Sequence, residues 1–185
     1  SPVVKPVMAG LKQYLSNNQE DKFLTVIYGE SYGWNIQEAK QYVIHSHKQK
    51  CRVFDMWKMP LTEVEKILAN NDVAGIASWR DKINQPYSQF NDLQSFCDKY
   101  SIDRTPIRAE INSSEIPTDV IETAHWLEQF KQSVAELDTP ENDETTNKKY
   151  LQAEGVVIRT KDRSFIRKLR FEDYQKGERQ NYREE

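Results

Sequence analysis

Two short segments near the end of this 185-residue chain alternate in polarity and are joined by a few polar residues. The first segment covers residues 153–159, the second covers 165–171, and the charged connection between them is 161–164. A period of two is typical of strands, and a short polar connection between two such runs is typical of a hairpin. The sequence therefore predicts a β-hairpin over 153–171, and the fold has to accommodate these two antiparallel strands.

Alternation also assigns the hairpin side chains to faces, because residues two apart in a strand point the same way. Glu154 is expected on the same face as Val156 and Ile158. On the second strand, Lys168 and Arg170 share a face. One carboxylate and two cations on neighbouring strands are the groups that hold a divalent metal together with a phosphate. The alternative is an amphipathic hairpin with a solvated charged face.

Outside the hairpin, hydrophobic periodicity predicts helices and strands in mixed order. Helices are expected at 3–17, from 61, near 88–100 and near 118–137, and strands at 23–28, 51–57 and 107–111. Thr62 is expected to cap the second helix, with Glu65 completing a capping box, and Thr118 to cap the fourth. Because the elements do not follow a β-α-β order, they indicate an α+β fold with a largely antiparallel sheet.

The composition argues against a membrane protein and against an indiscriminate nucleic-acid binder. Hydrophobic residues make up 37%, charged residues 30%, and the net charge is −3. No apolar run approaches the roughly 20 residues that cross a bilayer. Cys51 and Cys97 are isolated, which predicts a reducing, cytoplasmic setting. Residues 159–170 carry many cations against Asp162 alone, so a local basic strip can bind phosphates although the whole chain is acidic.

Four short segments occur in a fixed order along the chain: YGESYG at 28–33, VFDM at 53–56, EGVVIR at 154–159 and KLR at 168–170. They resemble the third motif of the ATP-dependent RNA ligase family, the aromatic motif that follows it, and the fourth and fifth motifs. The resemblance spans nearly the whole chain. It implies a nucleotidyltransferase (ligase adenylation) domain over 1–176, with antiparallel sheets flanked by helices, and a charged tail over 177–185.

The resemblance implies that five side chains bind ATP and its metal. Glu30 would face the ribose, and Phe54 would stack on the adenine. Glu154 would serve the metal-dependent step, holding Mg²⁺ or Mn²⁺, and would form the catalytic set with Lys168 and Arg170, which contact the α-phosphate. Arginine stands where lysine is usual at the second position of the fifth motif. It can still bind phosphate through its forked donors, but a role as a proton donor is in doubt.

The residues by themselves also allow plainer interpretations of the first two motifs. Glu30 fits a solvated turn residue between Gly29 and Gly33, at the end of a strand. Phe54 fits an aromatic residue of the core. Asp55 and Arg52 fit an ordinary cross-strand pair.

The residue that starts catalysis in this family has no match in the chain. That residue is a lysine in a Lys-x-x-Gly or Lys-x-Asp-Gly setting, several dozen residues before the third motif, which attacks the α-phosphate of ATP. Lys5, Lys12 and Lys22 have no glycine at the required offset. The domain is therefore expected to be N-terminally incomplete, as a piece of a longer ligase, or to be a variant without the adenylated lysine. Whether this chain is an enzyme by itself is left open.

The expected function is ATP-dependent joining of RNA ends, in a nicked duplex or as free ends, through an AMP-activated 5′-phosphate. The expected partners are RNA and ATP, with no membrane. One alternative is a non-catalytic nucleotide-binding or RNA-binding module with the same fold. Another is a related DNA ligase or capping-type nucleotidyltransferase. The segment KLRFEDY at 168–174 resembles RNA ligases better than it resembles either of these.

Overall fold

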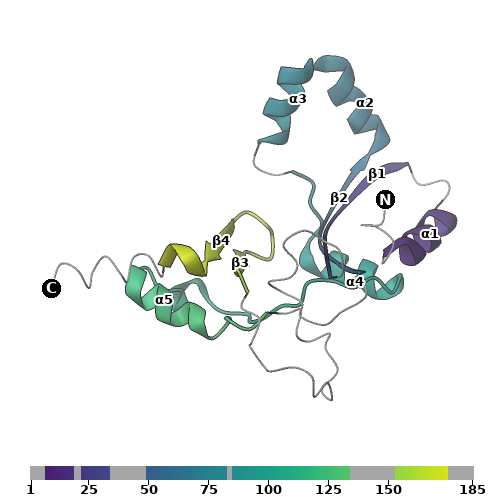
Figure 1. The fold of residues 1–185 in the computed structure, drawn as a ribbon. Coiled ribbons are helices and arrows are strands. Elements are labelled where there is room, and N and C mark those ends of the chain that lie inside the picture. The colour runs from purple at the N-terminus through teal and green to yellow at the C-terminus, as the bar shows by residue number, and fades with distance from the viewer. Residues whose placement is uncertain (1–6, 19–21, 34–48, 83–84, 134–152, 175–185) are drawn as a thin grey trace. The chain divides into compact units, whose positions relative to one another are not determined.

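The computed structural model describes residues 7–18, 22–33, 49–82, 85–133 and 153–174 (Figure 1). The elements are α1 (Met8–Asn17), β1 (Phe23–Gly33), β2 (Gln49–Pro60), α2 (Leu61–Asn70), α3 (Val73–Arg80), α4 (Phe90–Lys99), the 3-10 helix η3 (Ser113–Glu115), α5 (Val120–Glu128), β3 (Gly155–Arg159) and β4 (Ile166–Arg170). Strands β1 and β2 form one sheet, and β3 and β4 form another. Mixed helices and small sheets confirm the α+β class predicted from the sequence.

Contacts divide the chain into two compact units. The first contains Ser1–Ser31, Lys50–Thr105 and Thr160–Phe165, and the second contains Tyr32–Gln49, Pro106–Arg159 and Ile166–Glu185. Within the described ranges, no helix is long and apolar enough to span a bilayer. The predicted boundaries of the nucleotidyltransferase domain, 1–176, and of the tail, 177–185, stay predictions, and residues 175–185 lie outside the described part of the chain.

The core of the first unit lies where β2 meets α1 and α4. Its buried residues are Val7, Cys51, Val53, Met56, Leu93, Cys97, Tyr100 and Ile102. Leu93 and Cys97 are four residues apart, a spacing that places them on one apolar face of the predicted helix, and α4 buries both. Helix α1 comes so close to this core that a Cβ on Gly10 would lie 2.4 Å from the Tyr100 carbonyl oxygen.

Strand β1 continues through the segment that was predicted to turn, and this corrects the turn interpretation of Glu30. Near one end of the sheet, the Leu61 amide donates to the Lys22 carbonyl at 2.8 Å. Further along β1, a Cβ on Gly29 would lie 3.1 Å from the carbonyl oxygen of Arg52, so the two strands run antiparallel. Gly29 thus serves a close approach between strands, and pairing with the long β2 keeps Glu30 in extended backbone.

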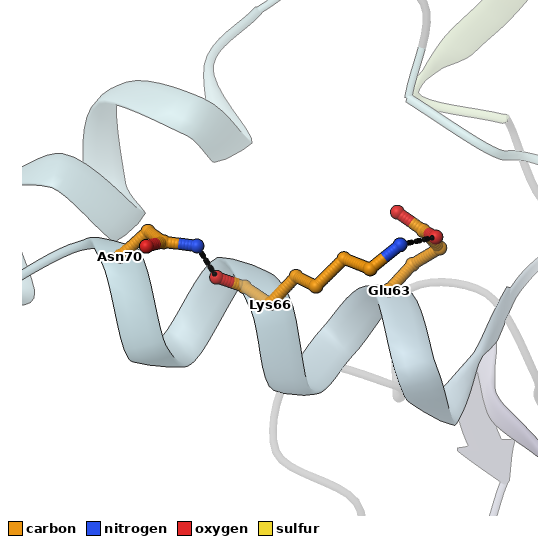
Figure 2. A network of polar contacts seen from close by, with 3 residues as sticks. All are labelled: Glu63, Lys66 and Asn70. Atoms are coloured by element: carbon orange, nitrogen blue, oxygen red, sulfur yellow. Dashed lines mark hydrogen bonds and ion pairs between the residues drawn. The ribbon is translucent and has the colours of Figure 1, made fainter.

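The start of α2 differs from the predicted capping box. Pro60 is the N-cap, no side chain caps the helix, and Thr62 lies inside the first turn. Proline favours the extended backbone that precedes a helix. It also has no amide N–H, and an N–H at this position would find no partner within the helix. Along the exposed surface of α2, Lys66 Nζ donates to Glu63 Oε1 at 2.7 Å and Asn70 Nδ2 donates to the Lys66 carbonyl at 2.8 Å (Figure 2).

Three predictions for residues 107–137 were also wrong in detail. Residues 107–111 do not form a strand, because apolar and polar alternation alone supplies no partner strand. Helix α5 is capped by Asp119 and not by Thr118, since the Asp119 carboxylate accepts from the amides of Ile121 and Glu122 at 2.8 and 3.1 Å. The helix ends at Glu128 instead of near 137, and residues 134–137 lie outside the described ranges.

The buried thiol of Cys97 gives a first testable expectation. Its side chain is fully shielded from solvent, and burial raises its pKa to about 11. Because only the thiolate is nucleophilic, native protein at about pH 8 should not react with a maleimide at this residue. The folded-state pKa lies above the unfolded value, so the thiol's contribution to stability is complete below about pH 9 and is lost as the pH rises through about 11.

Mass spectrometry after labelling checks this expectation, with protein labelled in denaturant as the control. Modification of Cys97 in native protein, at the rate measured in denaturant, would contradict the described packing of α4.

Candidate functional site

The predicted hairpin is present, with the predicted turn. Strands β3 and β4 pair antiparallel, with Val156 opposite Leu169, Val157 opposite Lys168 and Gly155 opposite Arg170. Directly opposed residues share a face. Lys168 and Arg170 therefore lie on one face, as expected, and that face also carries the exposed side chain of Val157.

The structure brings Glu154 and Lys168 together, which strict alternation does not predict. Alternation places Glu154 with Val156, whose face contains Leu169 and not Lys168. Glu154 precedes β3 at a bend, where its carbonyl still accepts from the Phe171 amide at 3.0 Å. Its carboxylate is thereby available to Lys168, whose Nζ donates to Glu154 Oε2 at 2.6 Å.

The Glu154–Lys168 ion pair is accessible to a ligand. The side chains keep 43% exposure at Lys168 and 51% at Glu154. An ion pair this exposed contributes about 0–1 kcal/mol to stability. Breaking the pair therefore costs little free energy, and an incoming phosphate can bind the Lys168 ammonium while a cation binds the Glu154 carboxylate.

The glycine between Glu154 and the rest of β3 has a steric role. A Cβ on Gly155 would lie 1.9 Å from the Leu169 carbonyl oxygen and 2.8 Å from the Arg170 Cα. Both obstacles are backbone atoms of β4, which cannot move without breaking the ladder. The side chain of Arg170 is exposed, and its guanidinium lies 3.5 Å from the carboxylate of Glu172, which is also exposed. Gly155 thus permits the close strand pairing that positions the Glu154 carboxylate beside Lys168.

The other two predicted site residues lie on the sheet of the first unit. Glu30 is exposed on β1. On β2, Phe54 is 42% exposed between the buried residues Val53 and Asp55. The interpretation of Phe54 as a core aromatic is therefore wrong, and an accessible ring on a strand is suited to stacking against a planar base.

The first unit contains a buried cluster that no sequence pattern indicated. Asp55 forms an ion pair with Arg163, in which both side chains are largely buried, and the Arg163 guanidinium lies over the Tyr87 ring at 4.6 Å. The Tyr87 ring in turn lies 5.9 Å from the ring of Tyr28. Burial raises the pKa of Tyr87, and the hydrogen bond with Tyr28 and the negative charge of Asp55 add to the effect.

This cluster corrects the expected pairing of Asp55. Arg52 donates to the Arg104 carbonyl at 2.9 Å, and Asp55 pairs with Arg163. No local pattern connects Asp55 with a residue so far along the chain, so sequence periodicity gave no signal for it.

The donor chemistry of the described residues limits how a metal can be held. No group of three or more His, Cys, Asp or Glu side chains in these residues is arranged to hold a metal ion. Mg²⁺ commonly uses one or two carboxylates and takes its other ligands from water and substrate phosphates. The exposed carboxylate of Glu154, next to two cations that can bind those phosphates, fits that pattern.

Comparison with known proteins identifies the family. A search of curated proteins found no match to the chain. The family model described as RNA ligase matches residues 3–173, and this span includes both sheets and all four of the motifs predicted from the sequence. The chain therefore belongs to the RNA ligase family.

Proposed function

We propose that this chain binds ATP with a divalent cation and takes part in joining RNA ends through an AMP-activated 5′-phosphate. The observation that supports it most directly is the exposed Glu154–Lys168 pair, at 2.6 Å, in a hairpin whose strands resemble two RNA ligase motifs and lie within the span that the family model matches. A solvated ion pair of this kind can open to accept a phosphate and a cation together.

Each predicted residue has a role that its environment allows. Lys168 and Arg170 lie on one strand face and would neutralise the charge that develops on the α-phosphate as it is attacked. Phe54 would stack on the adenine, a contact typically worth about 1–3 kcal/mol. Glu30 would bind the ribose. Glu154 would hold Mg²⁺ or Mn²⁺, and the ion would screen the negative charge of the phosphates when bound.

The final joining step does not use the adenylated lysine. The 3′-hydroxyl oxygen of one RNA end attacks the 5′-phosphorus of an end that already carries AMP. A new phosphorus–oxygen bond forms, the bond to AMP breaks, AMP leaves, and the hydroxyl proton passes to solvent. Adenylation of the protein precedes this step in the family. Since Lys5, Lys12 and Lys22 have no glycine at the family's offset, this chain is expected to form no covalent AMP adduct.

A second candidate is a module that binds the nucleotide or RNA without catalysis, through the same exposed residues. The two candidates differ in one measurement. A ligase seals an RNA end that is already adenylated, whereas a binding module retains it unchanged.

Thermal denaturation with and without ATP and magnesium tests the proposed site. A ligand at about a hundred times its Kd stabilises a folded protein by about 2.7 kcal/mol, so Tm should rise in the parent chain. Lys168→Ala should lose most of this rise while its Tm without ligand stays close to the parental value, because the pair it breaks is exposed.

The matched control is Lys66→Ala, which breaks a pair of similar length and exposure with Glu63 on α2. It should keep the parental response to ATP. An undiminished response in Lys168→Ala would instead support a hairpin whose charged face is only solvated.

A further inference from the structure

Arg163 combines three local features that each carry a cost. Its backbone is in the left-handed region, with φ of 62°. Its side chain is only 12% exposed although it is charged. Its Nη1 atom is buried and has no hydrogen-bond partner among the residues that the structure describes. Such features persist where the surroundings impose them and are concentrated at functional positions.

The backbone alone does not require arginine at this position. The turn is built by local hydrogen bonds: the Thr160 amide donates to the Phe165 carbonyl at 3.1 Å, and the Arg163 amide donates to the Thr160 carbonyl at 3.1 Å. The Asp162 carboxylate accepts from the amide and the hydroxyl of Ser164 at 3.1 and 2.8 Å. A glycine would adopt the positive φ at no steric cost. The side chain of Arg163 must therefore supply what compensates for these costs.

That side chain reaches a rigid part of β2. Its partner Asp55 also accepts from the Met56 amide at 3.1 Å. The Tyr87 ring beneath the guanidinium is held on β2 as well, because Tyr87 forms a β-bridge with Trp57. Asp55 directly follows Phe54, and the chain leaves the turn into β4, which carries Lys168. One buried ion pair thus fixes the turn at 160–165 against the strand that carries the proposed adenine contact.

We propose that Arg163 is a positioning residue, whose ion pair with Asp55 fixes the hairpin turn against β2 and holds the part of β2 next to Phe54 in the conformation that binds the nucleotide. This inference rests on the proposed function for the identity of the ligand. The anchoring itself can be tested without any ligand.

Two other roles for Arg163 predict different results. If the pair only stabilises the fold, its loss lowers Tm but leaves the nucleotide affinity of the folded protein unchanged. If Arg163 itself binds phosphate, removing the Asp55 charge leaves affinity unchanged or improves it, since a carboxylate repels a polyanion. Anchoring predicts instead that loss of either partner weakens binding.

The affinity test measures Kd for ATP with magnesium by calorimetry, at a temperature where each variant is folded. Asp55→Asn and Arg163→Gln should each weaken binding by about tenfold or more, and the double variant should be no weaker than the worse single one. Lys161→Ala is the control, because it removes an exposed cation from the same turn, and it should bind ATP like the parent chain. Parental affinity in Asp55→Asn would overturn the proposal.

Breaking a buried pair can prevent folding, so a third variant is included. Asp55→Leu combined with Arg163→Met replaces the pair by apolar side chains, a change that folded proteins often tolerate. It should fold and still bind ATP about tenfold more weakly than the parent chain, because packing is restored but the directional link is not. Parental affinity in this variant would also overturn the proposal.

Amide hydrogen exchange without nucleotide separates this inference from the proposed function. In the parent chain, the amides of residues 160–165 should exchange slowly, and in the folded variants lacking the ion pair they should exchange about tenfold faster or more. Unchanged exchange would overturn the anchoring even if ATP binds. A parent chain with slow exchange but no ATP binding would contradict the proposed function and leave the anchor supported.

Discussion

Gly155→Ala is expected to disrupt the β3–β4 hairpin and to lower the free energy of unfolding by about 3 kcal/mol or more. The added Cβ would lie 1.9 Å from the Leu169 carbonyl oxygen, so the two strands have to separate at this point. Separation also removes the backbone that places Glu154 beside Lys168, and the response of Tm to ATP should disappear with it. Chemical denaturation measures the first effect and thermal denaturation with ATP the second.

Gly75→Ala is the control for this change. A Cβ there would lie 2.8 Å from Asn71 Oδ1 and 3.0 Å from Asn71 Cβ, which are atoms of an exposed side chain and not of a paired strand backbone. Alanine within α3 should even stabilise the helix by about 0.5–1 kcal/mol relative to glycine. Parental stability in Gly155→Ala, with the hairpin amides still protected, would show that the strands do not pair as closely as described.

Glu154→Gln is expected to slow the sealing of a pre-adenylated RNA end by roughly a hundredfold, equivalent to about 3 kcal/mol in the barrier. Glutamine keeps the size and hydrogen-bonding capacity of the side chain but loses the negative charge that would hold a cation near the phosphates. Its fold should be retained, because the lost pair with Lys168 is exposed. Single-turnover sealing of a nicked duplex over a range of magnesium concentrations measures the effect.

Substitutions of two other carboxylates serve as controls for this result. Glu30→Gln should retain more activity, because a ribose contact contributes mainly to binding. Glu63→Gln breaks a comparable surface pair on α2 and should seal like the parent chain. Sealing by Glu154→Gln at the parental rate at every magnesium concentration would show that Glu154 is not the metal carboxylate. No sealing by the parent chain itself would favour the binding module.

Much of the candidate site could be predicted from the sequence, because its signals are local. The period-two pattern and the polar turn at 161–164 are enough to specify β3, β4 and their pairing. The order of four short motifs indicated the RNA ligase family, and the family model confirms it. The amphipathic face of α4, with Leu93 and Cys97 buried, is another local pattern that the structure confirms.

The tertiary structure decided the features whose partners lie elsewhere in the chain. Glycines at 29 and 33 indicated a turn, but the long neighbouring strand β2 keeps Glu30 in β1. Alternation separated Glu154 from Lys168, whereas the bend before β3 brings the carboxylate to the lysine. The pair between Asp55 and Arg163 had no sequence signal at all. Periodicity reports which face a side chain takes within its own element, while contacts between elements depend on register, bends and packing that only the folded chain fixes.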